Sequence, residues 1–169
     1  MENLLYILGQ AFGILAMVFG FISFQRKTQL GIIVFQCGTG FAFAAHYLLL
    51  GATTAVVLNL LSAFICICLG IRNKMNSTSN IATIICISLI VISGILSWDN
   101  IFSLFLILGL VVVNLSLSFT NPQHTRYAVF VKCPLCLTYN IAVGSIGGVI
   151  FECISLISAI IGIVKHNKK

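Results

Sequence analysis

Apolar segments, each about as long as a bilayer is thick, follow one another along almost the whole chain. They cover residues 3–23, 28–50, 52–71, 81–97, 101–120 and 125–143, and a seventh runs from the Gly144–Ser145 turn to near Lys165. A transmembrane helix needs about 20 apolar residues, so seven such helices use nearly all of the 169 residues. Lipid offers no partner for backbone amides, and each segment is therefore predicted to be a helix. The predicted fold class is an all-α, polytopic membrane bundle.

The composition excludes most other classes of protein. Hydrophobic residues make up 60% of the chain and charged residues 7%, whereas a soluble domain carries about 25% charged residues. No length remains for a soluble catalytic or nucleotide-binding domain. The net charge of +6 comes from basic residues scattered in short loops, which does not indicate nucleic acid as a partner. We expect no enzymatic activity, no metal and no cofactor, because the sequence contains no serine–histidine–acid set, metal-ligand cluster or phosphate-binding loop.

The distribution of charge predicts the orientation in the membrane. When the loops are numbered alternately, one set contains Glu2 and Asp99 and no basic residue. The other set and the C-terminal tail contain Arg26, Lys27, Arg72, Lys74, Arg126, Lys165, Lys168 and Lys169. Basic residues concentrate on the cytoplasmic side, which predicts an outer N-terminus and a cytoplasmic C-terminus.

The two halves of the chain resemble each other. Tyr47 is followed by Gly51 and by a helix ending at Gly70, while Tyr139 is followed by Gly144 and by a helix ending at Gly162. The offset is 92 to 93 residues, and each unit contains three segments. The fourth segment restores the direction of the chain, so the prediction is two parallel repeats in a 3+1+3 arrangement. The corresponding divisions are repeat 1 at 1–74, a linker helix at 75–98 and repeat 2 at 99–169.

The sequence resembles the YgjV-like family of bacterial inner-membrane proteins. The stretches that carry this resemblance are Ile22–Lys27, His46–Ala52, Tyr139–Ile141 and Gly144–Gly148. The resemblance implies a multi-pass protein of the bacterial inner membrane and little chemistry. The 3+1+3 architecture also looks like that of SWEET sugar transporters and PnuC-type transporters. SWEET-type bundles have prolines in several helices, whereas Pro134 is the only proline inside a predicted helix here, which leaves a proline-hinged mechanism in doubt.

Polar residues inside apolar segments are costly and usually face a cavity or a partner. Gln10, Asn59 and Glu152 lie about seven residues from the predicted outer ends of their helices, roughly 10 Å deep. His46 and Thr138 lie somewhat nearer the outer surface. These five residues are the predicted substrate-binding layer.

Asn59 and Glu152 are also repeat mates. In SWEET-type transporters paired polar residues on these helices line the substrate cavity, and Asn59 and Glu152 look like that pair. Glu152 could carry a proton or bind a cationic or hydroxyl-rich substrate. The alternative is structural, with Gln10 and Asn59 hydrogen-bonded to neighbouring helices and Glu152 protonated.

A second polar layer, nearer the cytoplasm, is predicted at Gln36, Asn114 and Lys132. Lys132 lies two turns into its segment, where its ammonium group can reach the lipid headgroups. The alternatives are a contact to an anionic substrate or an ion pair with Glu152. That pair would have to span about 10 Å of depth.

Two other motifs carry weaker hypotheses. Cys133 and Cys136 form a C-x-x-C pair, but the segment lies in the reducing cytoplasmic half and no second cysteine pair exists in an outer loop. Small-residue spacing at Gly9-x-x-x-Gly13 and Gly144-x-x-x-Gly148 is suited to helix packing within the bundle or within a homo-oligomer. Asn76–Thr78 fits the glycosylation pattern by chance, since it falls on the cytoplasmic side.

The sequence predicts a small facilitator or proton-coupled transporter for a polar metabolite, with the substrate between the two three-helix units. The expected partners are a small-molecule substrate and the lipid bilayer. The alternative is a non-transporting protein on the same scaffold, either a receptor or a subunit of a membrane complex. A closed, dry bundle would favour this alternative.

Overall fold

A computed structural model describes residues 2–75 and 80–166 of the chain. Asn76–Thr78 and the tail residues Lys168 and Lys169, which entered the predictions above, lie outside the described residues. The described part of the chain is all-helical, as predicted. Its helices are α1 (Glu2–Phe24), α2 (Gln29–Leu50), α3 (Thr53–Lys74), α4 (Ile81–Leu96), α5 (Ser103–Leu117), α6 (Pro122–Ala142) and α7 (Ile146–His166).

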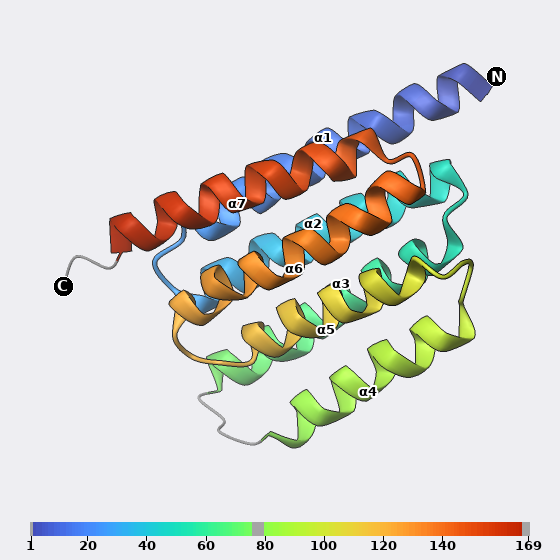
Figure 1. Ribbon diagram of the computed structural model, residues 1–169. Helices are drawn as coiled ribbons and strands as arrows, with labels where there is room; N and C mark the ends of the chain where they lie inside the picture. Colours follow the sequence, from blue (N-terminus) through green and yellow to red (C-terminus); the bar gives the residue numbers. More distant parts are fainter. Residues whose placement is uncertain (1, 76–79, 167–169) are drawn as a thin grey trace.

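The helices form two layers of three, with α4 outside them (Figure 1). Helix α2 packs between α1 and α3 in one layer, and α6 packs between α5 and α7 in the other. Across the layers α1 contacts α7 and α3 contacts α5, while α4 contacts only the α3–α5 edge of the bundle. Facing helices run in the same direction, and α2 lies opposite α6 at the centre (Figure 1).

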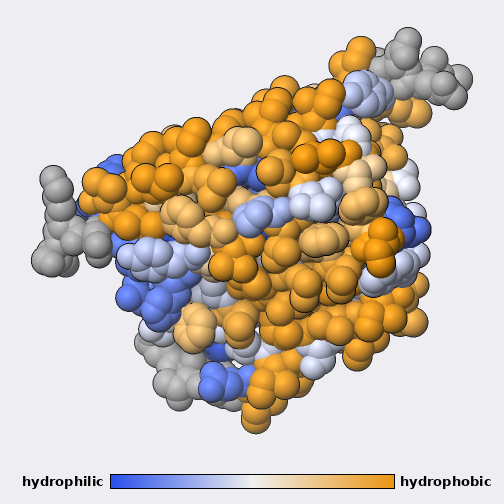
Figure 2. All heavy atoms as spheres, viewed as in Figure 1, coloured by the Kyte–Doolittle hydropathy of each residue, from blue (hydrophilic) through white to orange (hydrophobic). Residues whose placement is uncertain are grey.

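The surface of the bundle is suited to lipid. Large apolar side chains are exposed along the helices, including Leu48 at 67% and Ile84 at 63%, while Lys132 and Glu152 are buried. This is the reverse of a soluble protein, in which charged residues lie outside. Figure 2 shows a broad apolar expanse over the helices, with hydrophilic residues gathered mainly at the two ends.

Helices α1, α2, α3 and α7 are long and apolar enough to span a membrane. Helices α4 and α5 are apolar but have 16 and 15 residues. Helix α6 has 21 residues and carries polar groups along its length. The polar content of α6 is explained by its central position, where its side chains face protein on several sides.

The largest difference from the predicted helix boundaries is at the start of α6. Asn121–Pro122 indicated a turn before a helix at 125, but the helix begins at Pro122. Asn121 is the N-cap, and its side chain accepts a hydrogen bond from the backbone N–H of Gln123 at 2.9 Å. Proline is favoured at the first helical position because its missing N–H has no helical partner there. Arg126 therefore lies inside the helix, and not in a loop as predicted.

Two glycines with positive φ end the central helices. Gly51 follows α2 with φ of 73°, and Gly144 follows α6 with φ of 67°. At this φ a β-carbon clashes with the backbone, and glycine permits the tight turns into α3 and α7. Together these turns define one end of the bundle, here named the glycine-turn end. The opposite end, which carries Arg26, Lys27, Arg72, Lys74 and Arg126, is named the basic end.

Burial recurs along the chain with a separation of 93 residues, which is also the separation of Tyr47 and Asn140. Every buried residue of α7 lies 93 positions after a buried residue of α3, including Glu152 after Asn59 and Gly162 after Leu69. The same holds for all buried residues of α6 relative to α2 except Val129, which follows the half-buried Gln36.

This register corrects part of the predicted repeat. The Gly51–Gly144 and Asn59–Glu152 correspondences keep the separation of 93, but Tyr47 corresponds to Asn140 and not to Tyr139. The correspondence of Gly70 with Gly162 is likewise wrong by one residue. Matching letters in apolar segments are a weaker guide than helical burial, because the side of a helix that faces the core is set by its 3.6-residue period.

Candidate functional site

A cavity of about 50 Å³ lies between the two layers of helices. A buried water molecule needs at least about 10–15 Å³ measured in this way, so the cavity has room for a few waters. Its walls come from all helices except α4. The polar residues that line it are Gln36, Thr39, Tyr47, Asn59, Ser62, Lys132, Asn140 and Glu152.

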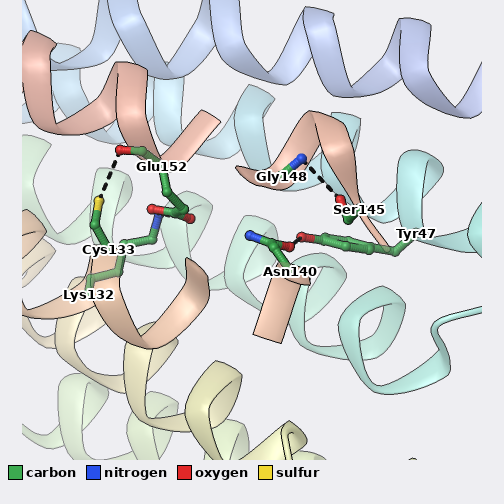
Figure 3. A network of polar contacts seen from close by, with 7 residues as sticks. All are labelled: Tyr47, Lys132, Cys133, Asn140, Ser145, Gly148 and Glu152. Atoms are coloured by element: carbon green, nitrogen blue, oxygen red, sulfur yellow. Dashed lines mark hydrogen bonds and ion pairs between the residues drawn. The ribbon is translucent and has the colours of Figure 1, made fainter. Parts of the chain in front are cut away.

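An ion pair between Lys132 and Glu152 forms one wall of the cavity (Figure 3). The Lys132 Nζ atom lies 2.6 Å from each carboxylate oxygen of Glu152, and their side chains are only 10% and 4% exposed. Nζ also lies 4.6 Å from the centre of the Phe151 ring, a favourable position for a cation. Removing either partner would leave an uncompensated buried charge, which is strongly destabilising.

The ion pair excludes the interpretation in which Lys132 extends to the lipid headgroups. Lys132 lies ten residues after Pro122, midway along α6 and roughly 15 Å from its start. Glu152 lies six residues after Ile146, roughly 9 Å into α7 from the other end. The predicted gap of about 10 Å was too large because α6 was expected to begin at residue 125. The remaining difference in depth is within the reach of a lysine and a glutamate side chain.

A hydrogen bond between Tyr47 of α2 and Asn140 of α6 joins the two layers at the glycine-turn end of the cavity. The tyrosine hydroxyl donates to the Asn140 Oδ1 atom, and both residues are buried. Asn140 also lines a separate crevice at that end, beside Gly144 and Ser145. The hydrogen-bonded pair thus separates the cavity from this outer crevice (Figure 3).

Gly148 makes room for this arrangement. A methyl group on Gly148 would overlap the Asn140 side-chain amide and the Ser145 hydroxyl. The backbone N–H of Gly148 instead donates to Ser145 Oγ at 3.0 Å. A close approach of α6 and α7 at this point requires a residue without a side chain.

Backbone and side-chain contacts also close the basic end of the cavity. Phe24 and Leu117, each 2% exposed, line the cavity there. Arg126 is buried, and its Nε atom donates to the carbonyl oxygen of Phe24 at 3.0 Å. A second guanidinium nitrogen donates to the carbonyl of Arg26. Arg126 thus ties the end of α1 to α6, so the cavity is closed at both ends.

The eight predicted site residues divide into three groups. Glu152, Asn59, Gln36 and Lys132 line the cavity together. Asn114 lies behind the cavity wall, where its Nδ2 atom donates to Ser62 Oγ at 2.9 Å.

The remaining three predicted residues do not line the cavity. His46 is fully buried nearer the glycine-turn end, 2.7 Å from both the Gly9 carbonyl oxygen and Ser145 Oγ. Gln10 accepts a hydrogen bond from the Gly147 N–H at 3.1 Å, and its Nε2 atom has no partner in the structure. Thr138 donates to Pro134 of its own helix. His46 and Gln10 therefore belong to the helix contacts at that end.

Sequence reasoning did not identify Tyr47, Asn140, Thr39 and Cys136 as cavity residues. Tyr47 and Asn140 were noticed only as markers of the repeat. The separation of 93 residues was the signal that could have found them, because it relates Tyr47 to Asn140 in the same way as Asn59 to Glu152. Cys136 also lines the cavity, and Cys133 donates to the Glu152 carbonyl oxygen at 3.5 Å. Within residues 2–75 and 80–166, no three His, Cys, Asp or Glu side chains are grouped to hold a metal.

Comparison with known proteins identifies the family. The family model described as a bacterial inner membrane protein, Imp-YgjV, matches residues 7–169. Searches of curated proteins and of solved structures gave no match. The match covers all of α2–α7 and most of α1, and it agrees with the apolar surface of the bundle. The chain therefore belongs to the YgjV family of bacterial inner membrane proteins, and it resides in that membrane as a multi-pass protein.

Proposed function

We propose that this protein is a small transporter that carries a polar solute across the inner membrane through the cavity between α1–α3 and α5–α7. The observation that carries this proposal is a buried ion pair, Lys132–Glu152, on the wall of a polar cavity at the centre of the bundle. Charged groups inside a membrane protein are expensive and usually mark a solute or ion pathway. The chain contains no nucleotide-binding motif, so transport is downhill or coupled to an ion gradient.

The arrangement of helices supports two parallel units related by an axis along the membrane normal. Residues 93 apart meet across the cavity, and the contact of α1 with α7 corresponds to the contact of α5 with α3. The pairs that line the cavity are Phe24–Leu117, Thr39–Lys132, Phe43–Cys136, Tyr47–Asn140 and Asn59–Glu152. Transporters with parallel repeats bind their substrate at the repeat interface. In this 3+1+3 proposal α4 is the linker that restores the chain direction.

Closure at both ends makes this an occluded state. The Tyr47–Asn140 hydrogen bond closes the glycine-turn end, and the contacts of Phe24 and Arg126 close the basic end. Rocking of one unit against the other would open one end at a time. By the positive-inside rule the glycine-turn end faces outward and the basic end faces the cytoplasm.

A second candidate function is a receptor or a subunit of a membrane complex. The observation that favours it is the small volume of the cavity, about 50 Å³, which admits water but no metabolite without rearrangement. Such a protein would use the same scaffold without opening it. Neither candidate is an enzyme or a nucleic-acid-binding protein, and a homo-oligomer is compatible with both.

The test is solute uptake by proteoliposomes that contain the purified full-length chain, screened against a metabolite library. We expect uptake of at least one polar solute, and loss of that uptake in Glu152→Gln, which keeps the shape of the side chain and removes its charge. Glu2→Gln, which changes the other glutamate of the chain, is the matched control and retains uptake. Wild-type uptake by Glu152→Gln at every pH would refute the role of Glu152. Absence of uptake across the library would refute transport and favour the second candidate.

A further inference from the structure

Resting on the proposed function, we infer that the transported solute is a small zwitterion, with one ammonium-type and one carboxylate-type group. The two charges that line the cavity cancel, and both belong to the second unit, Lys132 on α6 and Glu152 on α7. The facing wall from the first unit is polar but uncharged, and it consists of Gln36, Thr39, Tyr47, Asn59 and Ser62. The site is therefore matched to a solute that has no net charge and carries both signs.

The ion pair occupies the space that a solute would need. The cavity itself holds only a few waters, but Glu152 also lines a crevice of about 320 Å³ between α6 and α7. The carboxylate thus stands between two spaces, with Cys133 and Leu156 on the far side. Separating Lys132 from Glu152 is the smallest rearrangement that enlarges the cavity, and a solute that enters has to repay the loss of that contact.

Charge compensation decides which class of solute can repay it. An anion bound to Lys132 would leave Glu152 buried and unpaired, and a cation bound to Glu152 would do the same to Lys132. An unpaired buried charge is strongly unfavourable. A zwitterion exchanges partners, because its carboxylate replaces Glu152 at the Lys132 ammonium and its ammonium replaces Lys132 at the Glu152 carboxylate. Every charge then stays compensated. A neutral solute would leave the pair closed and the cavity at its small volume.

The experiment compares four matched pools of solutes in proteoliposomes of the full-length protein. One pool contains small amino acids, and the others contain the hydroxy acids, amines and alcohols obtained by exchanging the ammonium or carboxylate group for a hydroxyl. Lumenal contents are measured by mass spectrometry. We expect the amino-acid pool to enter at least about ten times faster than each other pool, since tenfold corresponds to a small part of the cost of an unpaired charge.

Two single variants and one double variant test the residues. Lys132→Gln leaves a net negative site, so its preference should shift to the amine pool. Glu152→Gln leaves a net positive site, and its preference should shift to the hydroxy-acid pool. A purely structural ion pair would not give this reciprocal change. If either single variant fails to insert, the uncharged double variant Lys132→Gln/Glu152→Gln carries the test, and it should lose the preference for amino acids over alcohols. Lys27→Gln, an exposed residue outside the cavity, is the control and should keep the wild-type preference.

The outcomes separate this inference from the proposed function. Faster uptake of hydroxy acids, amines or alcohols than of amino acids by the wild-type protein overturns the zwitterion and leaves transport standing. Unchanged preference in both single variants also overturns it. Failure of all four pools to enter overturns the inference, and failure of the wider metabolite library in addition overturns transport.

Discussion

At the scale of single residues, the site depends on two contacts that cross between helices. Lys132 and Glu152 hold α6 and α7 together through a buried ion pair, and Tyr47 and Asn140 hold the two layers together through a hydrogen bond. The first contact lies within one unit and the second joins the two units. The ion pair therefore sets what the cavity binds, and the hydrogen bond sets how easily its glycine-turn end opens.

The energetic coupling of Lys132 and Glu152 can be measured in detergent by thermal or chemical unfolding. Each single variant, Lys132→Gln and Glu152→Gln, leaves one buried charge and should lower the free energy of unfolding by about 3 kcal/mol. The double variant leaves no charge and should be more stable than either single variant. Destabilisation of the double variant equal to the sum of the single effects would show that the two side chains are not coupled.

The Tyr47 hydroxyl is predicted to hold the glycine-turn end closed. Tyr47→Phe removes one hydrogen bond, worth about 1 kcal/mol, and should raise the population of the state open at that end about fivefold. Reaction of a cavity cysteine with a membrane-impermeant thiol reagent reports this population. Tyr6→Phe makes the same chemical change at an exposed position of α1 and should have no effect. Equal rates in the two variants would remove Tyr47 from the closure.

At the scale of helices and turns, the sequence predicted most of the fold and less of the site. The apolar segments identified the helices to within a few residues, because a membrane span has a fixed minimum length. Hydropathy could not locate the start of α6, since Asn121–Pro122 is both a turn signal and a helix N-terminus. That error of three residues misplaced Lys132 in depth and hid its contact with Glu152. Contacts such as Tyr47–Asn140 depend on how α2 faces α6, which no local pattern determines.

The two turns at the glycine-turn end are predicted to behave alike. Gly51→Ala and Gly144→Ala each force a β-carbon into positive φ and should cost about 1–2 kcal/mol of stability. Space is not the cause, because a β-carbon at either position would meet no atom within 4 Å. Gly70→Ala is the control, since Gly70 is helical and its β-carbon would make ordinary contacts at 3.5 Å. Equal stability of all three variants in thermal unfolding would contradict the role of positive φ.

At the scale of the whole molecule, the account describes two three-helix units that enclose one polar cavity and present apolar surfaces to lipid. The separation of 93 residues runs through helices α1–α3 and α5–α7, whereas α4 packs only at the edge. This organisation is suited to motion between units, because few side chains outside the cavity have to change partners across the central α2–α6 contact. The basic end carries the positive charge and should therefore face the cytoplasm.

Reporter fusions test this orientation. Alkaline phosphatase, which is active only outside the cytoplasm, should be active when fused after Gly51, Asp99 or Gly144 and inactive after Lys27, Lys74 or the C-terminal Lys169. A cytoplasmic fluorescent reporter should give the complementary pattern. An active phosphatase at Lys169 would contradict the orientation and the parallel direction of the two units.

The most direct test of the central claim is whether water reaches the cavity from both sides of the membrane. Ser62 lines the cavity, and Ser62→Cys can be placed in a background in which the seven native cysteines are replaced by alanine. Ser116→Cys is the control, because Ser116 is equally buried and does not line the cavity. The account predicts that a membrane-impermeant thiol reagent modifies Ser62→Cys from either side and stops uptake, while Ser116→Cys stays unmodified. Reaction of Ser62→Cys no faster than that of Ser116→Cys from both sides would show a closed, dry bundle and contradict transport through this cavity.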